Sequence, residues 1–83
     1  MRMMMFVSCL KREVRAIADE FEDWKQEGLE VRLYGNRAKA NDGFLLLAWN
    51  QPIPQQFFDK LKDDEDILDY LIYEPAFSQP RPA

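Results

Sequence analysis

Six consecutive apolar residues lie near the middle of the chain, within the segment Gly43-Phe44-Leu45-Leu46-Leu47-Ala48-Trp49-Asn50. Asp42-Gly43 opens this run and Asn50-Gln51-Pro52 closes it, so the run is too short for a typical helix. Because apolar and polar residues do not alternate in it, the run is typical of a strand that is covered on both faces. We therefore predict a central strand here, which the other elements must be arranged to cover.

Three further segments are predicted as strands. Residues 3–9 form a second short apolar run, which suits a buried strand better than a separate helix. Residues 29–34 alternate strictly, which indicates a strand with one face buried and one in solvent. Residues 67–73 form an apolar strand interrupted only by Asp69. The polar segment 35–43 is a predicted hairpin loop.

Two segments have the period of a helix. Apolar residues of 10–27 are spaced by four, three, four and three, which places them on one helical face. They are Leu10, Val14, Ile17, Phe21 and Trp24, and Gly28 ends the helix. Ile53, Phe57 and Leu61 form the inner face of a second helix, with prolines in its first turn.

The resulting order is strand, helix, strand, strand, helix, strand, which is the split βαβ or ferredoxin-like pattern. Two right-handed crossovers then give a four-stranded antiparallel sheet with both helices on one face. The first and third strands are central in this α+β arrangement. We expect a single domain at 1–74 and a Pro-rich tail at 75–83 without regular structure. If residues 3–9 are not a strand, a three-stranded sheet with two helices is the alternative.

Composition limits the possible partners. The chain has 83 residues, 47% of them hydrophobic and 31% charged, as expected for one ordinary globular domain. Its net charge of −4 argues against broad attraction to nucleic acid or anionic membranes. No apolar stretch approaches the ~20 residues that span a bilayer, and Cys9 has no second cysteine to pair with. We expect a cytoplasmic protein that does not bind membranes.

Residue types that are missing from the chain limit its chemistry. It has no histidine and no threonine, which excludes Ser-His and Cys-His nucleophilic pairs and Cys/His zinc sites within one chain. The three glycines match no phosphate-binding loop. A thiol that enters a helix can have a lowered pKa, but we favour a buried structural role for Cys9. We expect no catalytic site, no metal and no cofactor.

The predicted architecture leaves one sheet face without a cover. The third strand exposes there either Phe44, Leu46 and Ala48 or Leu45, Leu47 and Trp49. The last strand adds either Leu68, Tyr70 and Ile72 or Ile67, Leu71 and Tyr73. We predict that Leu45, Leu47, Trp49, Leu71 and Tyr73 are the partner-binding residues. Monomers seldom leave so large an apolar patch in water, so we expect either a homodimer or a docking site for another protein.

Two functions compete on this evidence. We favour a non-enzymatic protein-interaction module, such as an adaptor, regulator or inhibitor, with the hairpin residues Arg37 and Lys39 as a secondary contact. The alternative is a single-stranded nucleic-acid-binding domain that stacks bases on Trp49, Tyr34 and Tyr73, next to Arg32, Arg37 and Lys39. The acidic charge argues against this alternative. Asp69 is either a guard of the apolar edge strand or, as we prefer, a solvated edge residue.

Overall fold

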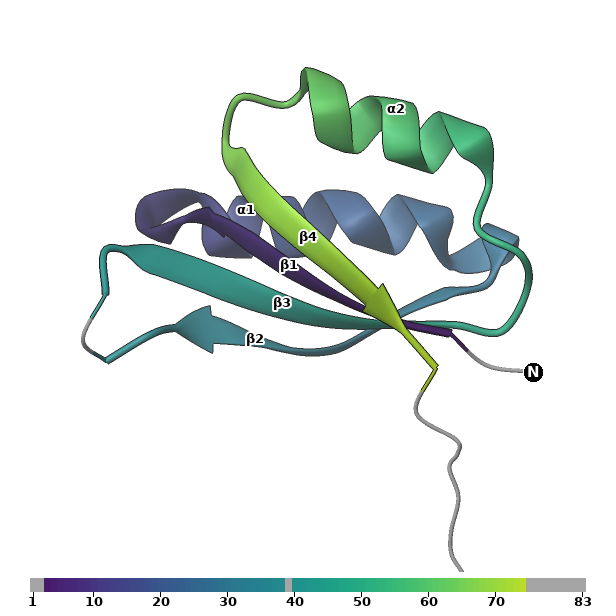
Figure 1. Cartoon of the computed structure of the whole chain (residues 1–83), viewed down its shortest axis with the longest axis horizontal. Coiled ribbons are helices and arrows are strands. Elements are labelled where there is room, and N and C mark those ends of the chain that lie inside the picture. The colour runs from purple at the N-terminus through teal and green to yellow at the C-terminus, as the bar shows by residue number, and fades with distance from the viewer. Residues whose placement is uncertain (1–2, 39, 75–83) are drawn as a thin grey trace, which may run out of the picture.

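The computed structural model describes residues 3–38 and 40–74, which form a four-stranded antiparallel sheet with two helices on one face (Figure 1). The elements are β1 (Met3–Leu10), the 3₁₀ turn η1 (Lys11–Glu13), α1 (Val14–Phe21), the 3₁₀ turn η2 (Glu22–Glu27), β2 (Leu29–Asn36), β3 (Asp42–Trp49), α2 (Gln55–Asp63) and β4 (Ile67–Tyr73). The strand order is β2-β3-β1-β4, which confirms the ferredoxin-like prediction. The tail predicted at 75–83 lies outside the described residues.

β1 and β3 are the two central strands, as their continuous apolar sequences predict. β1 pairs antiparallel with β3 on one side and with β4 on the other. Residues 3–9 therefore do form a strand, and the alternative with three strands is wrong. Because each central strand has neighbours on both sides, its backbone groups are paired along both edges.

The predicted first helix is divided into three pieces, η1, α1 and η2. Leu10 does not belong to it, because its backbone pairs with Asp42 and its N–H donates to the Asp66 carbonyl oxygen at 2.9 Å. Gly28 ends η2 with φ +104°, a left-handed conformation that suits glycine. The second helix begins at Gln55, directly after the prolines rather than with them.

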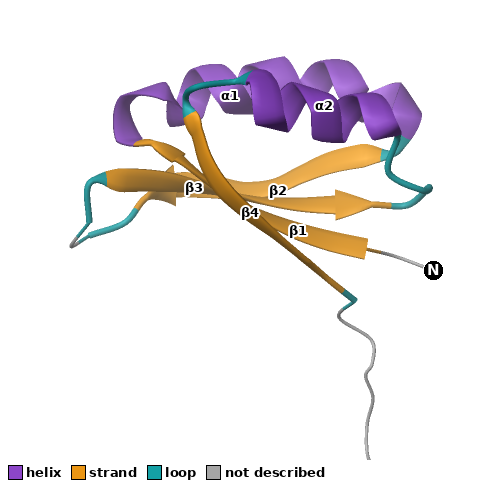
Figure 2. Ribbon diagram, turned by 45° about the horizontal axis from the view of Figure 1, so that its top comes forward, coloured by secondary structure: helices purple, strands orange, loops and turns teal. Residues whose placement is uncertain are grey.

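Both helices lie on the same side of the sheet, and the core lies between the two layers (Figure 2). Alternate residues of β1 and β3 enter this core together with the apolar faces of the helices. Aromatic rings fill its centre: the Phe57 ring centroid lies 4.8 Å from that of Trp49 and 5.1 Å from those of Phe21 and Trp24. Within α1 and α2 the helical periods read from the sequence thus mark the buried faces correctly, whereas Leu10 and Ile53 lie outside the helices.

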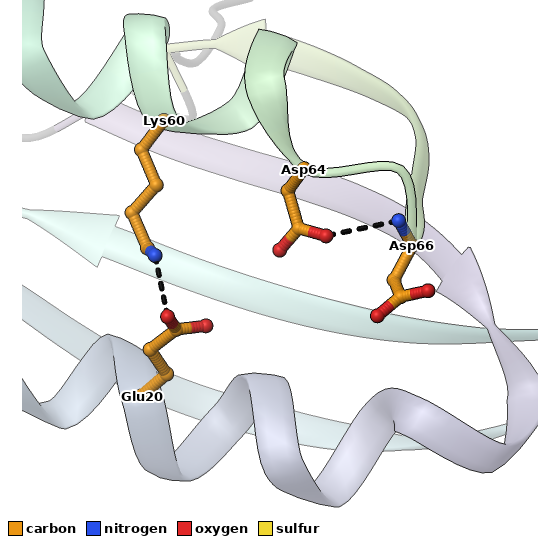
Figure 3. A network of polar contacts seen from close by, with 4 residues as sticks. All are labelled: Glu20, Lys60, Asp64 and Asp66. Carbon is orange, nitrogen blue, oxygen red and sulfur yellow. Dashed lines mark hydrogen bonds and ion pairs between the residues drawn. The ribbon is translucent and has the colours of Figure 1, made fainter.

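Polar contacts connect the helices at the surface (Figure 3). Lys60 of α2 donates to Glu20 of α1, with 2.6 Å between Nζ and Oε2. Since both side chains are partly exposed, this ion pair contributes at most about 1 kcal/mol. Beyond α2, the Asp64 carboxylate accepts the backbone N–H of Asp66 at 2.9 Å and shapes the turn into β4.

Gly43 allows α1 to approach β3 closely. A Cβ atom at this position would lie only 2.9 Å from Cβ of Val14, a stiff β-branched residue that cannot move aside cheaply. We expect Gly43→Ala to lower the free energy of unfolding by about 1–3 kcal/mol, the usual cost of overpacking. Urea denaturation followed by circular dichroism measures this loss.

Gly35→Ala is the matched control for Gly43→Ala. A Cβ atom at Gly35 would meet its nearest neighbour, a ring carbon of Phe44, at 3.4 Å, which is an ordinary contact. We expect this variant to lose less than about 1 kcal/mol, as a substitution outside the tightly packed core does. Equal losses in the two variants would show that the close approach of α1 to β3 is not limiting.

Candidate interaction surface

The sheet face opposite the helices is the candidate functional surface, and Figure 2 shows no described element beneath it. Residues directly opposite each other in antiparallel strands share a face, and Phe6 pairs with Leu46 on one side and Leu71 on the other. We call this surface the open face. Its large apolar residues are Met4, Phe6, Leu33, Phe44, Leu46, Leu71 and Tyr73. Leu71 is 63% exposed, Leu33 55% and Tyr73 42%.

The prediction that Leu45, Leu47 and Trp49 lie on the uncovered face is wrong. All three are 0% exposed and belong to the core beneath the helices. β3 is apolar at every position from 44 to 49, so its alternation cannot show which side is covered. Pairing with β1 decides this instead, since Leu45 and Leu47 lie opposite Val7 and Met5, which are also buried.

The other predicted contact residues have different positions. Leu71 and Tyr73 do lie on the open face. Arg37 follows β2, and its guanidinium carbon lies 5.6 Å from the centre of the Phe6 ring, over the same face. Lys39 lies outside the described residues. The open face therefore brings together Leu71, Tyr73 and Arg37 from the predicted set.

A register shift in β4 changes which of its side chains face outward. Ser8 pairs with Asp69 whereas Cys9 pairs with Ile67, so Leu68 is an extra residue in the ladder. Ile67 consequently packs against the core rather than sharing a face with Leu71. Leu68, 53% exposed, lines a shallow depression together with Leu61 at the end of α2.

Phe6 and Phe44 form the aromatic centre of the open face, and Phe44 belongs to the alternative set of β3 residues that we did not favour from the sequence. Their rings are nearly parallel, with an interplanar angle of 8° and centroids 5.9 Å apart. Ser8 was the available signal, because it is the only polar residue in the first apolar run and it pairs with both Phe44 and Asp69. A serine and an aspartate whose side chains lie on the same face of the sheet indicate that this face is in contact with solvent.

The charges near the open face are largely paired. Arg37 lies 3.5 Å from the carboxylate of Asp42, and Arg32 lies 3.8 Å from that of Glu30. Neither described arginine beside this face is therefore an uncompensated cation. Such a surface attracts phosphate groups less strongly than two free arginines would.

The aromatic residues proposed to stack bases do not come together. Trp49 is buried in the core, and Tyr34 pairs with Leu45 and so belongs to the helix side of the sheet. Only Tyr73 of these three lies on the open face. The predicted stacking platform is therefore wrong in its residues, and Phe6 with Phe44 is the ring pair that this face presents.

Asp69 covers part of the free edge of β4. The Leu10 N–H donates to the carbonyl oxygen of Asp66, just before β4. Because the backbone N–H and C=O groups of every second residue in a strand point to the same side, those of the even-numbered β1 residues point toward β4. Tyr70 pairs with the odd-numbered Val7 and therefore directs its own N–H to the free edge. The Asp69 Oδ1 accepts this N–H at 2.8 Å. This bond favours the interpretation of Asp69 as an edge guard over that of a merely solvated residue.

We expect Asp69→Ala to promote aggregation through the β4 edge. The substitution removes the only charge within β4 and frees the Tyr70 N–H to pair with another strand. Thioflavin T fluorescence and light scattering should detect assemblies at severalfold lower protein concentration than for the unmodified chain. Asp63→Ala removes the same charge outside β4 and is the matched control. Equal solubility of the two variants would contradict the guard role.

Cys9 is a buried structural thiol, as we favoured, and its pKa is not lowered. Burial and the nearby carboxylates, of which Asp42 has the largest effect, raise the pKa of Cys9 from 9.0 to about 11. The thiolate, which is the reactive form, is therefore scarce in the folded protein at neutral pH.

We expect Cys9 to react with a thiol reagent at pH 8 about 100-fold or more slowly in the folded protein than in urea, because two pH units separate the two pKa values. Absorbance of released thionitrobenzoate measures the rate.

The raised pKa of Cys9 also makes the stability of the protein depend on pH. Because the pKa is higher in the folded chain than in the unfolded one, the thiol contributes its full share to the free energy of unfolding below pH 9. This contribution is lost as the pH rises from 9 toward 11. Cys9→Ala should remove that part of the pH dependence, whereas rapid labelling of the folded chain would contradict the burial.

Other kinds of site find little support in residues 3–38 and 40–74. No group of three or more His, Cys, Asp or Glu side chains is placed to hold a metal ion there. A hollow between η2 and β2 is lined by the exposed polar residues Glu22, Lys25 and Asn50, together with Gly28 and Leu29. No helix in the same part of the chain is long and apolar enough to cross a membrane.

Comparison of the chain with protein-family models, curated proteins and solved structures finds no match.

Proposed function

We propose that this protein is a non-enzymatic interaction module that binds a second copy of itself through the open face. The observation that carries the proposal is the exposure of large apolar side chains on the face that the helices leave uncovered, above all Leu71 and Leu33. Monomeric proteins rarely keep contiguous apolar patches of this kind in water. A regulator or adaptor that works as a dimer fits these features, and the unpaired thiol of Cys9 fits a reducing compartment such as the cytoplasm.

The size of the open face supports a dimer of modest stability. The four strands lie about 4.8 Å apart and are seven or eight residues long, so at about 3.3 Å per residue the sheet spans roughly 19 by 26 Å. Two such faces would bury about 1,000 Å² in total, which is near the lower end for specific interfaces. Apolar contacts across aligned sheets resemble the core of a β-sandwich.

Molar mass tests this proposal directly. We would measure it by size-exclusion chromatography with light scattering, over a wide concentration range and at two salt concentrations. We expect twice the chain mass of 9.9 kDa at high concentration. High salt should leave the dimer intact, because apolar burial is not screened by ions. A mass of one chain under all these conditions would contradict self-association.

Single-stranded nucleic-acid binding is the second candidate, and the Phe6–Phe44 ring pair on the two central strands favours it. The pairing of Arg37 with Asp42 and the net charge of −4 weaken it. Fluorescence polarisation of labelled oligonucleotides at several salt concentrations would test this candidate. Salt-sensitive binding that Phe44→Ala abolishes would support it, and no binding at low salt would reject it.

A further inference from the structure

We infer that the two copies pack around a two-fold axis parallel to their strands, so that β2 of each copy covers β4 of the other. This inference rests on the proposed self-association and adds the arrangement of the partner. For aligned sheets, a two-fold axis within the interface can run along the strands or across them. An axis along the strands places β2 of one copy over β4 of the other. An axis across the strands places β2 over β2 and β4 over β4.

Apolar burial does not distinguish the two arrangements. Leu33 and Leu71 lie at the same level of the sheet, since both reach Phe6 and Leu46 through strand pairing. With the axis along the strands, Leu33 of one copy would cover Leu71 of the other. With the axis across them, each leucine would meet its own counterpart. Both arrangements remove the two leucines from water.

The charges at the two edges do distinguish the arrangements. The segment 63–74, which includes β4, has six acidic residues and no basic one: Asp63, Asp64, Glu65, Asp66, Asp69 and Glu74. At the β2 edge, Arg37 and Arg32 are paired with Asp42 and Glu30, so this edge is close to neutral. Packing β4 over β4 would oppose acids to acids. Packing β2 over β4 instead places the acids of β4 against a nearly neutral edge that carries two arginines, which is the more complementary choice.

The position of Asp69 supports this choice. Asp69 pairs with Ser8 at the level of Phe44 and Gly35, which is near the Arg37 end of β2. One carboxylate oxygen of Asp69 accepts the Tyr70 N–H, and its second oxygen is not used by that bond. An arginine of the partner's β2 edge is long enough to approach this second oxygen across sheets that pack about 10 Å apart.

Cysteine cross-linking distinguishes the two arrangements. We would prepare Leu33→Cys and Leu71→Cys separately, because both positions are exposed and the substitutions keep an apolar side chain. Each variant alone and an equimolar mixture would be treated with a short bismaleimide after subunit exchange. The unmodified chain is the control, since its Cys9 is buried and should not react. Light scattering of each sample shows whether the dimer is present.

We expect cross-linked dimers only in the mixture of the two variants. In the inferred arrangement, identical cysteines would lie about 14 Å apart laterally, in addition to the sheet spacing, and would exceed the reach of the reagent. Cross-linking of either variant with itself would overturn the inferred arrangement and leave the proposed dimer intact. A single-chain mass in every sample would overturn both. The outcome therefore separates a wrong arrangement from a wrong function.

Discussion

Trp49→Ala is expected to lower the free energy of unfolding by about 3–5 kcal/mol, as removal of a large buried aromatic side chain does. Trp49 is 0% exposed, and its ring packs edge-on against Phe57 in the centre of the core. Domains of this size are stable by only about 4–12 kcal/mol. The loss is therefore a large share of the total stability, and the midpoint of urea denaturation, followed by circular dichroism, should fall clearly below that of the unmodified chain.

Trp49→Phe is the control that keeps an aromatic ring in place. None of the described residues accepts a hydrogen bond from the Trp49 Nε1–H, which is buried. Burying such a donor without a partner costs about 1–3 kcal/mol, so its removal offsets part of the lost packing. We expect the phenylalanine variant to be clearly more stable than the alanine variant. An alanine variant that folds normally but no longer self-associates would place Trp49 on the interface after all.

Leu71→Glu is expected to raise the dissociation constant of the dimer by about 100-fold or more. Two-fold symmetry brings two new carboxylates into the same interface, and each buried, unpaired charge costs more than the roughly 1.4 kcal/mol that corresponds to a tenfold change. The free energy of unfolding of the monomer should change little, because Leu71 is 63% exposed. Sedimentation equilibrium measures the association, and urea denaturation measures the stability.

Leu68→Glu is the matched control for Leu71→Glu. It makes the same chemical change three residues earlier, at a position that is 53% exposed but is the extra residue of the β4 ladder and lines a hollow with Leu61 of α2. We expect its dissociation constant to equal that of the unmodified chain. Equal weakening by both glutamates would indicate a general effect of charge on β4, and no weakening by Leu71→Glu would contradict the open face as the interface.

Much of the fold was predictable because several local patterns agree. The apolar runs at 3–9 and 44–49 are typical of central strands, which is where β1 and β3 lie. The helical period places Ile17 and Phe21 on the buried face of α1, and Phe57 and Leu61 on that of α2. Consistency of this kind between local pattern and overall topology is typical of foldable sequences.

The composition of the open face was not predictable from the same patterns. Side chains alternate between faces with a period of two, so an unbroken apolar run is compatible with either parity. The alternative that contains Phe44 was not chosen for this reason, although Ser8 lies opposite Phe44 in the register.

The extra residue Leu68 also shifts the alternation along β4. A second register shift, at Arg32 in β2, places Leu33 on the open face, so the prediction that Leu33 shares a buried face with Leu29 and Val31 is wrong.

The amino-acid sequence by itself determined the element order, the two central strands and the placement of both helices on one sheet face, because these depend on short-range hydrophobic periods and on right-handed crossovers. Only the tertiary structure decided that Leu45, Leu47 and Trp49 are buried while Phe44 and Leu46 lie on the open face. That choice depends on the register between β1 and β3 and on the aromatic rings that the helices place above them. Both are long-range contacts, which no local pattern in the chain contains.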